Sequence, residues 1–161
     1  MTQPIQPPPS GNPFADGAYP NAPAPAPVRD NLGLGLAAAF GVALVSAGIY
    51  GAIVGATEYQ IGFAAVGVGY LVGFVAGKVG GRNPALPVVA AILSLGAVYI
   101  GQLLGIAIFL ADRADATVSE LFFENLDVLM EAWKLEAGAM TFVFLAIGAF
   151  AAFSAAKKSA A

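Results

Sequence analysis

The side chains best able to do chemistry in this sequence are acidic. Seven of the ten acidic residues lie between positions 112 and 136, and four of them fall within about 60° of one another on a helical wheel. These four are Glu120, Glu124, Asp127 and Glu131. Clustered carboxylates can attract cations or a basic partner, but general acid and base work needs a dry cleft. Because charge runs are usually solvated, we predict no catalysis here and keep two interpretations, a solvated face and a partner-binding or cation-attracting face.

The sequence lacks many of the residues from which active sites are built. It has no cysteine and no histidine, which excludes disulfides, thiolate chemistry, imidazole bases and the usual zinc or haem ligands. Its long apolar stretches contain no charged residue, so an intramembrane aspartyl dyad or proton relay has no place in them. The net charge of −3 argues against a basic nucleic-acid footprint. We therefore predict a non-enzymatic protein with no cofactor, no metal site and no nucleic-acid partner.

The composition indicates a membrane protein. Hydrophobic residues make up 58% of the chain and charged residues 11%, whereas soluble domains carry about 25% charged residues. Four apolar stretches approach or exceed the roughly 20 residues with which a helix crosses a bilayer. We predict an all-α membrane protein with transmembrane helices over 32–56, 61–77, 87–111 and 137–156, and one extramembrane amphipathic helix over 117–135.

The predicted amphipathic helix has a clear start signal. Thr117 and Glu120 have the spacing of a capping box, in which the Thr side chain accepts from the first-turn amides and the Glu side chain reaches back. Apolar side chains lie opposite the four acids, and Asn125 is the exception placed among them. We expect the apolar side to rest on the outer ends of the spans or on the membrane surface.

Small residues recur at every fourth position in three of the predicted spans. Because four residues advance a helix by about 400°, such residues line one face and let another helix approach closely. The predicted helix-packing positions are Gly51, Gly55, Gly69, Gly73, Gly77, Gly101 and Gly105. The isolated polar side chains receive structural roles: Gln102 in a hydrogen bond between helices, and Tyr50 in an interfacial aromatic belt.

Residues 1–30 differ in composition from the rest of the chain. Nine of the eleven prolines fall there, among too few apolar side chains to form a core. We predict a disordered, proline-rich cytoplasmic tail over 1–30 and a four-helix transmembrane domain over 31–161. A solvated spacer is the simpler interpretation of the tail, and docking of its proline runs on an aromatic-lined partner is the alternative.

The distribution of cations predicts the orientation. With four spans and a cytoplasmic N-terminus, the cytoplasmic side receives Arg29, Lys78, Arg82, Lys157 and Lys158, and the outer side receives Arg113 and Lys134. Lys and Arg are enriched in the cytoplasmic loops of membrane proteins. We therefore predict a multi-pass protein of the cell membrane, with both termini in the cytoplasm and the acidic helix outside.

One stretch carries a family resemblance. A short turn with Tyr59 leads into the pair Gly62-Phe63 and the helix start Gly67-Val68-Gly69-Tyr70, followed by a glycine-rich basic loop and another apolar helix. On this pattern the segment 48–108 resembles a loosely defined group of bacterial, Gly-rich multi-pass membrane proteins. The resemblance brings no activity, cofactor or site residue with it.

Two classes of function fit these observations. The first is a non-enzymatic scaffold or accessory subunit of a membrane complex, which would contact the lipid bilayer and either other membrane proteins or further copies of itself. The second is a small homo-oligomeric channel or transporter. A channel needs a continuous polar stripe along a span, whereas the polar residues of these spans are isolated, so we favour the scaffold.

Overall fold

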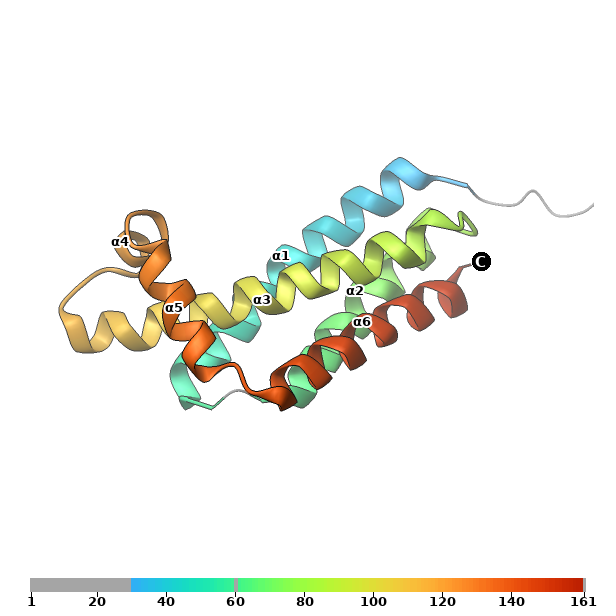
Figure 1. Cartoon of the computed structure of the whole chain (residues 1–161). Coiled ribbons are helices and arrows are strands. Elements are labelled where there is room, and N and C mark those ends of the chain that lie inside the picture. Colours follow the sequence, from blue (N-terminus) through green and yellow to red (C-terminus); the bar gives the residue numbers. More distant parts are fainter. Residues whose placement is uncertain (1–29, 60, 161) are drawn as a thin grey trace, which may run out of the picture.

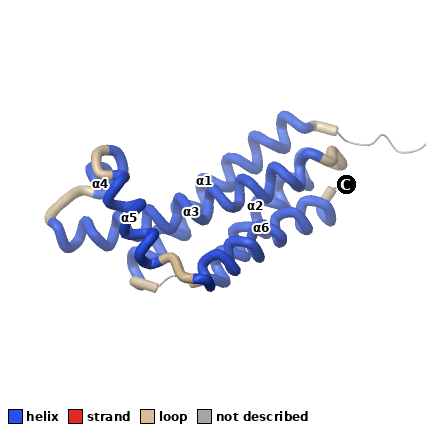
Figure 2. Tube along the Cα trace, viewed as in Figure 1, coloured by secondary structure: helices blue, strands red, loops and turns tan. Residues whose placement is uncertain are grey.

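The computed structural model describes residues 30–59 and 61–160, and this part of the chain is helical (Figure 1). Its helices are α1 (Leu32–Thr57), α2 (Gly62–Gly80), α3 (Ala85–Ala114), α4 (Val118–Phe123), α5 (Leu126–Glu136) and α6 (Ala139–Ser159). Figure 2 shows no strand among the described residues, whose one β-bridge pairs Asp30 with Gly81. The predicted all-α class is confirmed for this part. The predicted disordered tail lies outside it, apart from Asp30.

Four helices, α1, α2, α3 and α6, are long and apolar enough to cross a membrane. They correspond to the four predicted spans, with bounds that differ by a few residues. Three of the helices end three residues later than predicted: α2 at Gly80, α3 at Ala114 and α6 at Ser159. α2 ends where Gly81 adopts a φ of 79°, a backbone conformation that glycine reaches without steric cost.

The four long helices form two antiparallel hairpins stacked on one another. One hairpin is α1–α2 and the other is α3–α6; α1 packs most closely on α3, and α2 on α6. In the closely packed pairs α1–α3 and α2–α6, the two helices run in the same direction. In the first pair, Gly35 near the start of α1 meets Leu86 near the start of α3, and Gly55 near the end of α1 meets Ile108. Helices adjacent in sequence are therefore not the closest neighbours in space (Figure 1).

Small residues fill the interior of the bundle, and large apolar residues cover its outside. The main core cluster consists largely of alanines and valines, with Tyr50 as its one aromatic member. Exposed large side chains include Phe40 on α1, Phe63 on α2, Ile92 on α3 and Phe150 on α6. An apolar outer surface of this kind is suited to lipid, which has no polar groups to satisfy.

The connection between α3 and α6 contains two helices instead of the single helix predicted over 117–135. The predicted capping box is confirmed: the Glu120 amide donates to Thr117 Oγ1 at 3.2 Å, and the Thr117 amide donates to Glu120 Oε2 at 2.8 Å. The helix breaks at Asn125, whose backbone amide (3.2 Å) and side-chain Nδ2 (3.4 Å) both donate to the Glu120 carbonyl oxygen. Asn side chains compete with the helical backbone in this way, so the chain turns between α4 and α5.

We call α4 and α5 together the cap. The cap folds back on the second half of α3, as Figure 1 shows for the orange helices beside the yellow one. Leu121 of α4 and Leu129 of α5 are buried in a second cluster with Leu103, Ile106 and Ala107 of α3. The apolar side of the predicted amphipathic segment thus rests on a span, which is one of the two placements expected from the sequence.

Candidate functional site

The glycines of α2 line a close contact between helix backbones. A Cβ atom at Gly69, Gly73 or Gly77 would overlap the carbonyl oxygens of α6 at positions 148, 152 and 156, respectively. Each step of four residues on α2 thus matches a step of four on α6. Even one methyl group on this face would force the two helices apart, because close-packed backbones cannot yield as a flexible side chain can.

The four predicted positions on α1 and α3 form a second contact of a different kind. Here a side chain of one helix fills the notch left by a glycine of the other. Cβ atoms at Gly51 and Gly55 would lie 2.8 Å and 2.7 Å from the Cβ atoms of Leu104 and Ile108. In return, a Cβ atom at Gly105 would lie 2.7 Å from the Cβ of Val54, and Gly101 faces the Tyr50 ring. All seven predicted packing glycines therefore face a neighbouring helix.

Sequence reasoning missed the partner of the α2 stripe. Gly148, Ala152 and Ala156 of α6 are buried against it. They have the same four-residue spacing as the predicted stripes, so the signal was present in the sequence. A further close approach was also missed: Gly35 of α1 and Gly80 of α2 meet through their Cα atoms at the end of the bundle where α1 begins.

A polar cluster joins the cap to the bundle. The Trp133 indole Nε1 on α5 donates to the Gln102 Oε1 on α3 at 2.6 Å, and Gln102 also forms a hydrogen bond with Tyr50 of α1. The Trp133 ring packs edge-on against Tyr99, with 4.9 Å between ring centroids. Gln102 thus bonds between helices, as its position suggested. Tyr50 does not belong to an interfacial belt, because its side chain is buried between α1 and α3.

Two buried serines lie apart from this polar cluster. Among the described residues, the buried polar side chains are Ser46, Ser94 and Gln102. The Ser94 hydroxyl has no hydrogen-bond partner in that part of the chain. Ser46 lies on α1, and Ser94 and Gln102 lie on α3.

The four predicted partner-binding acids are exposed, but they do not share one helix face. Glu120 belongs to the capping box of α4 and Glu124 follows the last residue of that helix, whereas Asp127 and Glu131 lie on α5 beyond the break. Hydrogen bonds from the Thr117 amide, and then from its hydroxyl, lower the pKa of Glu120. In the described part of the chain, no three acidic residues converge as metal ligands.

An ion pair joins the end of α1 to α3 at the end of the bundle that carries the cap. The Arg113 guanidinium lies 3.1 Å from Glu58 Oε1 and stacks over the Phe109 ring at 3.6 Å from its centroid. Both charged side chains are partly exposed, so the pair adds little stability. Its effect is to fix the end of α1 beside the extension of α3 that carries the cap.

No family model, curated protein or solved structure matches the chain. The resemblance to Gly-rich bacterial membrane proteins therefore stays a prediction.

Proposed function

We propose that this chain is an integral protein of the cell membrane that acts as a non-enzymatic scaffold or accessory subunit of a membrane complex. The observation that carries the proposal is the contrast between a bundle interior closed by small residues and a cap that exposes large apolar ones. Phe123 on α4 is 84% exposed and Leu135 on α5 is 89% exposed. Both side chains lie within a segment rich in acidic residues, so the cap could bind a partner that has an apolar pocket surrounded by basic residues.

The charges at the two ends support an orientation with the cap outside. The start of α1, the end of α2, the start of α3 and the end of α6 gather at one end of the bundle (Figure 1). Lys78, Arg82, Lys157 and Lys158 belong to that end, and the cap belongs to the other. Because cations favour the cytoplasmic side, both termini would be cytoplasmic. Arg29, the fifth predicted cytoplasmic cation, lies outside the described residues.

Crosslinking from the cap tests the scaffold role. A photoreactive benzophenone residue placed at Phe123 or Leu135 should give discrete adducts of higher mass in cells. The matched control is Phe150 on α6, which is 70% exposed on a membrane-spanning helix and would face lipid, so it should give none. Replacing Glu120, Glu124, Asp127 and Glu131 by Gln should weaken the adducts. Equal labelling from Phe150, or no adduct from either cap position, would contradict the proposal.

Ion flux distinguishes the scaffold from the channel. The purified chain in vesicles should not dissipate a potassium or proton gradient faster than empty vesicles, because the spans carry isolated polar residues and no continuous polar stripe. A flux that increases with the amount of protein and is lost in Gln102→Leu would favour a homo-oligomeric channel instead.

A further inference from the structure

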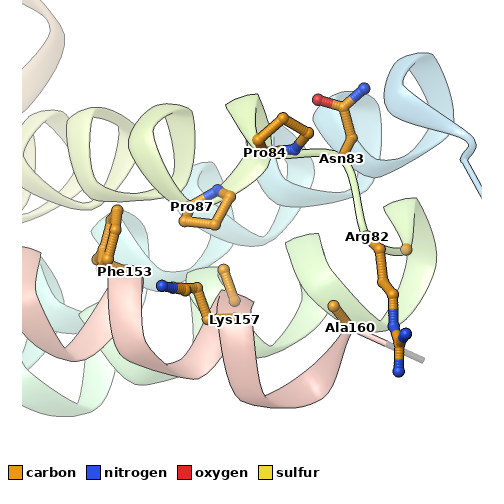
Figure 3. Close-up of a pocket in the computed structure, with 9 residues that line it drawn as sticks. Arg82, Asn83, Pro84, Pro87, Phe153, Lys157 and Ala160 are labelled. Atoms are coloured by element: carbon orange, nitrogen blue, oxygen red, sulfur yellow. The ribbon is translucent and has the colours of Figure 1, made fainter.

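A cavity lies at the end of the bundle opposite the cap. It has a volume of about 480 Å³ and is bounded by the loop after α2, the first turn of α3 and the last turns of α6. Two of its lining residues are cations, Arg82 from the loop and Lys157 from α6. Figure 3 shows Lys157 extending toward Phe153, and Arg82 extending from the loop in a different direction, outward past the end of α6 at Ala160.

The two cations are not neutralised within the described residues. The ion pair in that part of the chain joins Arg113 to Glu58 at the opposite end. The carboxylate at this end, Asp30, accepts a hydrogen bond of 3.1 Å from Asn83 Nδ2 and does not line the cavity. A cavity with two uncompensated cations favours an anionic ligand.

The start of α3 adds a positive field but few free donors. The Ala85 amide already donates to Asn83 Oδ1 at 2.9 Å, and the Leu86 amide donates to the Asn83 carbonyl at 3.2 Å. Pro87, which lines the cavity, has no amide hydrogen. The positive end of the helix dipole therefore favours an anion there, and the direct contacts fall to Arg82 and Lys157.

Apart from Asn83, the other residues that line the cavity are apolar. Phe153 and Pro87 form its deeper side, and the Lys157 Nζ lies 5.5 Å from the Phe153 ring centroid. The cations sit at the ends of α2 and α6, two of the helices long enough to span a bilayer. A free anion would leave the apolar walls uncovered, whereas a lipid would place its glycerol and first acyl carbons against them.

We propose that this cavity binds the phosphate of an anionic phospholipid, toward which the exposed Arg82 and Lys157 side chains turn from opposite sides of the opening. Basic pockets between transmembrane helices on the cytoplasmic side bind anionic head groups in this way. Arginine can contact two phosphate oxygens at once, and lysine acts as a point charge. The proposal requires membrane insertion but not the scaffold role, so either can fail while the other stands.

Two neighbouring cations give a matched control. Lys78 and Lys158 are exposed at the same end of the bundle but do not line the cavity. The double variants Arg82→Gln/Lys157→Gln and Lys78→Gln/Lys158→Gln therefore remove the same charge from the same end. All four side chains are exposed, and circular dichroism will show that both variants keep their helix content.

The test titrates the purified full chain in neutral detergent with dihexanoyl phosphatidylglycerol and follows thermal stability. The melting temperature should rise with the anionic lipid in the original chain and in the control variant. The cavity variant should bind dihexanoyl phosphatidylglycerol about 30-fold more weakly, because each of the two missing cations contributes roughly fivefold to the affinity for an anionic lipid. Equal loss in both variants would mean diffuse charge attraction and would overturn the proposal.

Two further ligands distinguish the source of the phosphate. Dihexanoyl phosphatidylcholine carries the same chains without net charge, and it should leave the melting temperature unchanged. Inorganic phosphate, at the same ionic strength, should also fail to raise it, because it cannot cover Phe153 and Pro87. If inorganic phosphate matches the anionic lipid, the site takes a free anion and the lipid assignment is wrong; if phosphatidylcholine matches it, the cations have no role.

Discussion

Trp133 of the cap and Gln102 of α3 are joined by a hydrogen bond of 2.6 Å between Nε1 and Oε1. This bond reaches from a helix outside the predicted spans to a buried amide inside one of them. It places α5 across α3 and couples the position of the cap to the packing of the bundle. An isolated Gln in a span would be costly, so the two residues depend on each other.

We predict that Trp133→Phe destabilises the protein. The Phe ring keeps an aromatic contact with Tyr99 but has no N–H donor, which leaves the buried Gln102 oxygen short of a partner at a cost of about 1–3 kcal/mol. Thermal unfolding in detergent measures the effect. Gln102→Leu added to Trp133→Phe should recover part of the loss, because it removes the unpaired oxygen. Additive losses in the double variant would show that the two residues do not interact.

We predict that Gly73→Ala separates α2 from α6. Its methyl group would overlap the Ala152 carbonyl oxygen, and overpacking of this kind costs about 1–3 kcal/mol. Gly67→Ala on the same helix is the matched control, since nothing lies within 4 Å of a Cβ atom there. That control should be neutral or slightly stabilising. If both variants melt at the same temperature, α2 and α6 do not pack through this face.

We predict that the start of α4 loosens in acid. The folded pKa of Glu120 lies below the value of 4.5 that is usual for the free side chain. The capping box therefore contributes stability at pH values above about 4.5, and the contribution is lost as the pH falls through the lower folded pKa. Carboxyl chemical shifts measured by NMR should show the Glu120 titration below 4.5. In Thr117→Ala the hydroxyl is gone but the backbone donor remains, so the Glu120 pKa should rise without reaching its usual value; an unchanged titration would contradict the assigned cause.

The spans and the capping box could be predicted because they depend on local sequence. Twenty-five consecutive uncharged residues from Leu32 to Ala56 can cross a bilayer as a helix whatever surrounds them, and Thr117 with Glu120 is a start signal that needs no tertiary context. The exact ends could not be read in the same way. A cation such as Lys78 can stay in a helix and extend its charge toward water, so a charged residue did not mark the end of α2.

The helix pairing could not be predicted, because stripes of small residues are interchangeable. The stripe at Gly69, Gly73 and Gly77 offers the same groove to any helix with small residues, and three other spans carry such residues. The choice of α6 depends on the whole bundle. Burial of Tyr50 depends on this pairing too, because its ring lies against Gly101 of α3.

The break between α4 and α5 and the basic cavity could not be predicted from the sequence, for two different reasons. Asn125 was visible as a polar residue on the apolar side of the predicted helix, but propensity alone does not distinguish a tolerated Asn from one that ends a helix. The cavity brings together Arg82 and Lys157, which are far apart in the sequence. Only the stacking of the α3–α6 hairpin on α1–α2 places them on the same opening.

Cysteine labelling in intact cells tests the central claim most directly, namely that the chain crosses the membrane four times with its basic end inside and its cap outside. The sequence contains no cysteine, so single variants report one position each, and Ser119 in the cap and Lys158 at the end of α6 are both exposed. A membrane-impermeant thiol reagent should label Ser119→Cys in intact cells, and should label Lys158→Cys only after the membrane is opened. Labelling of Lys158→Cys in intact cells, with Ser119→Cys protected until the membrane is opened, would contradict the account.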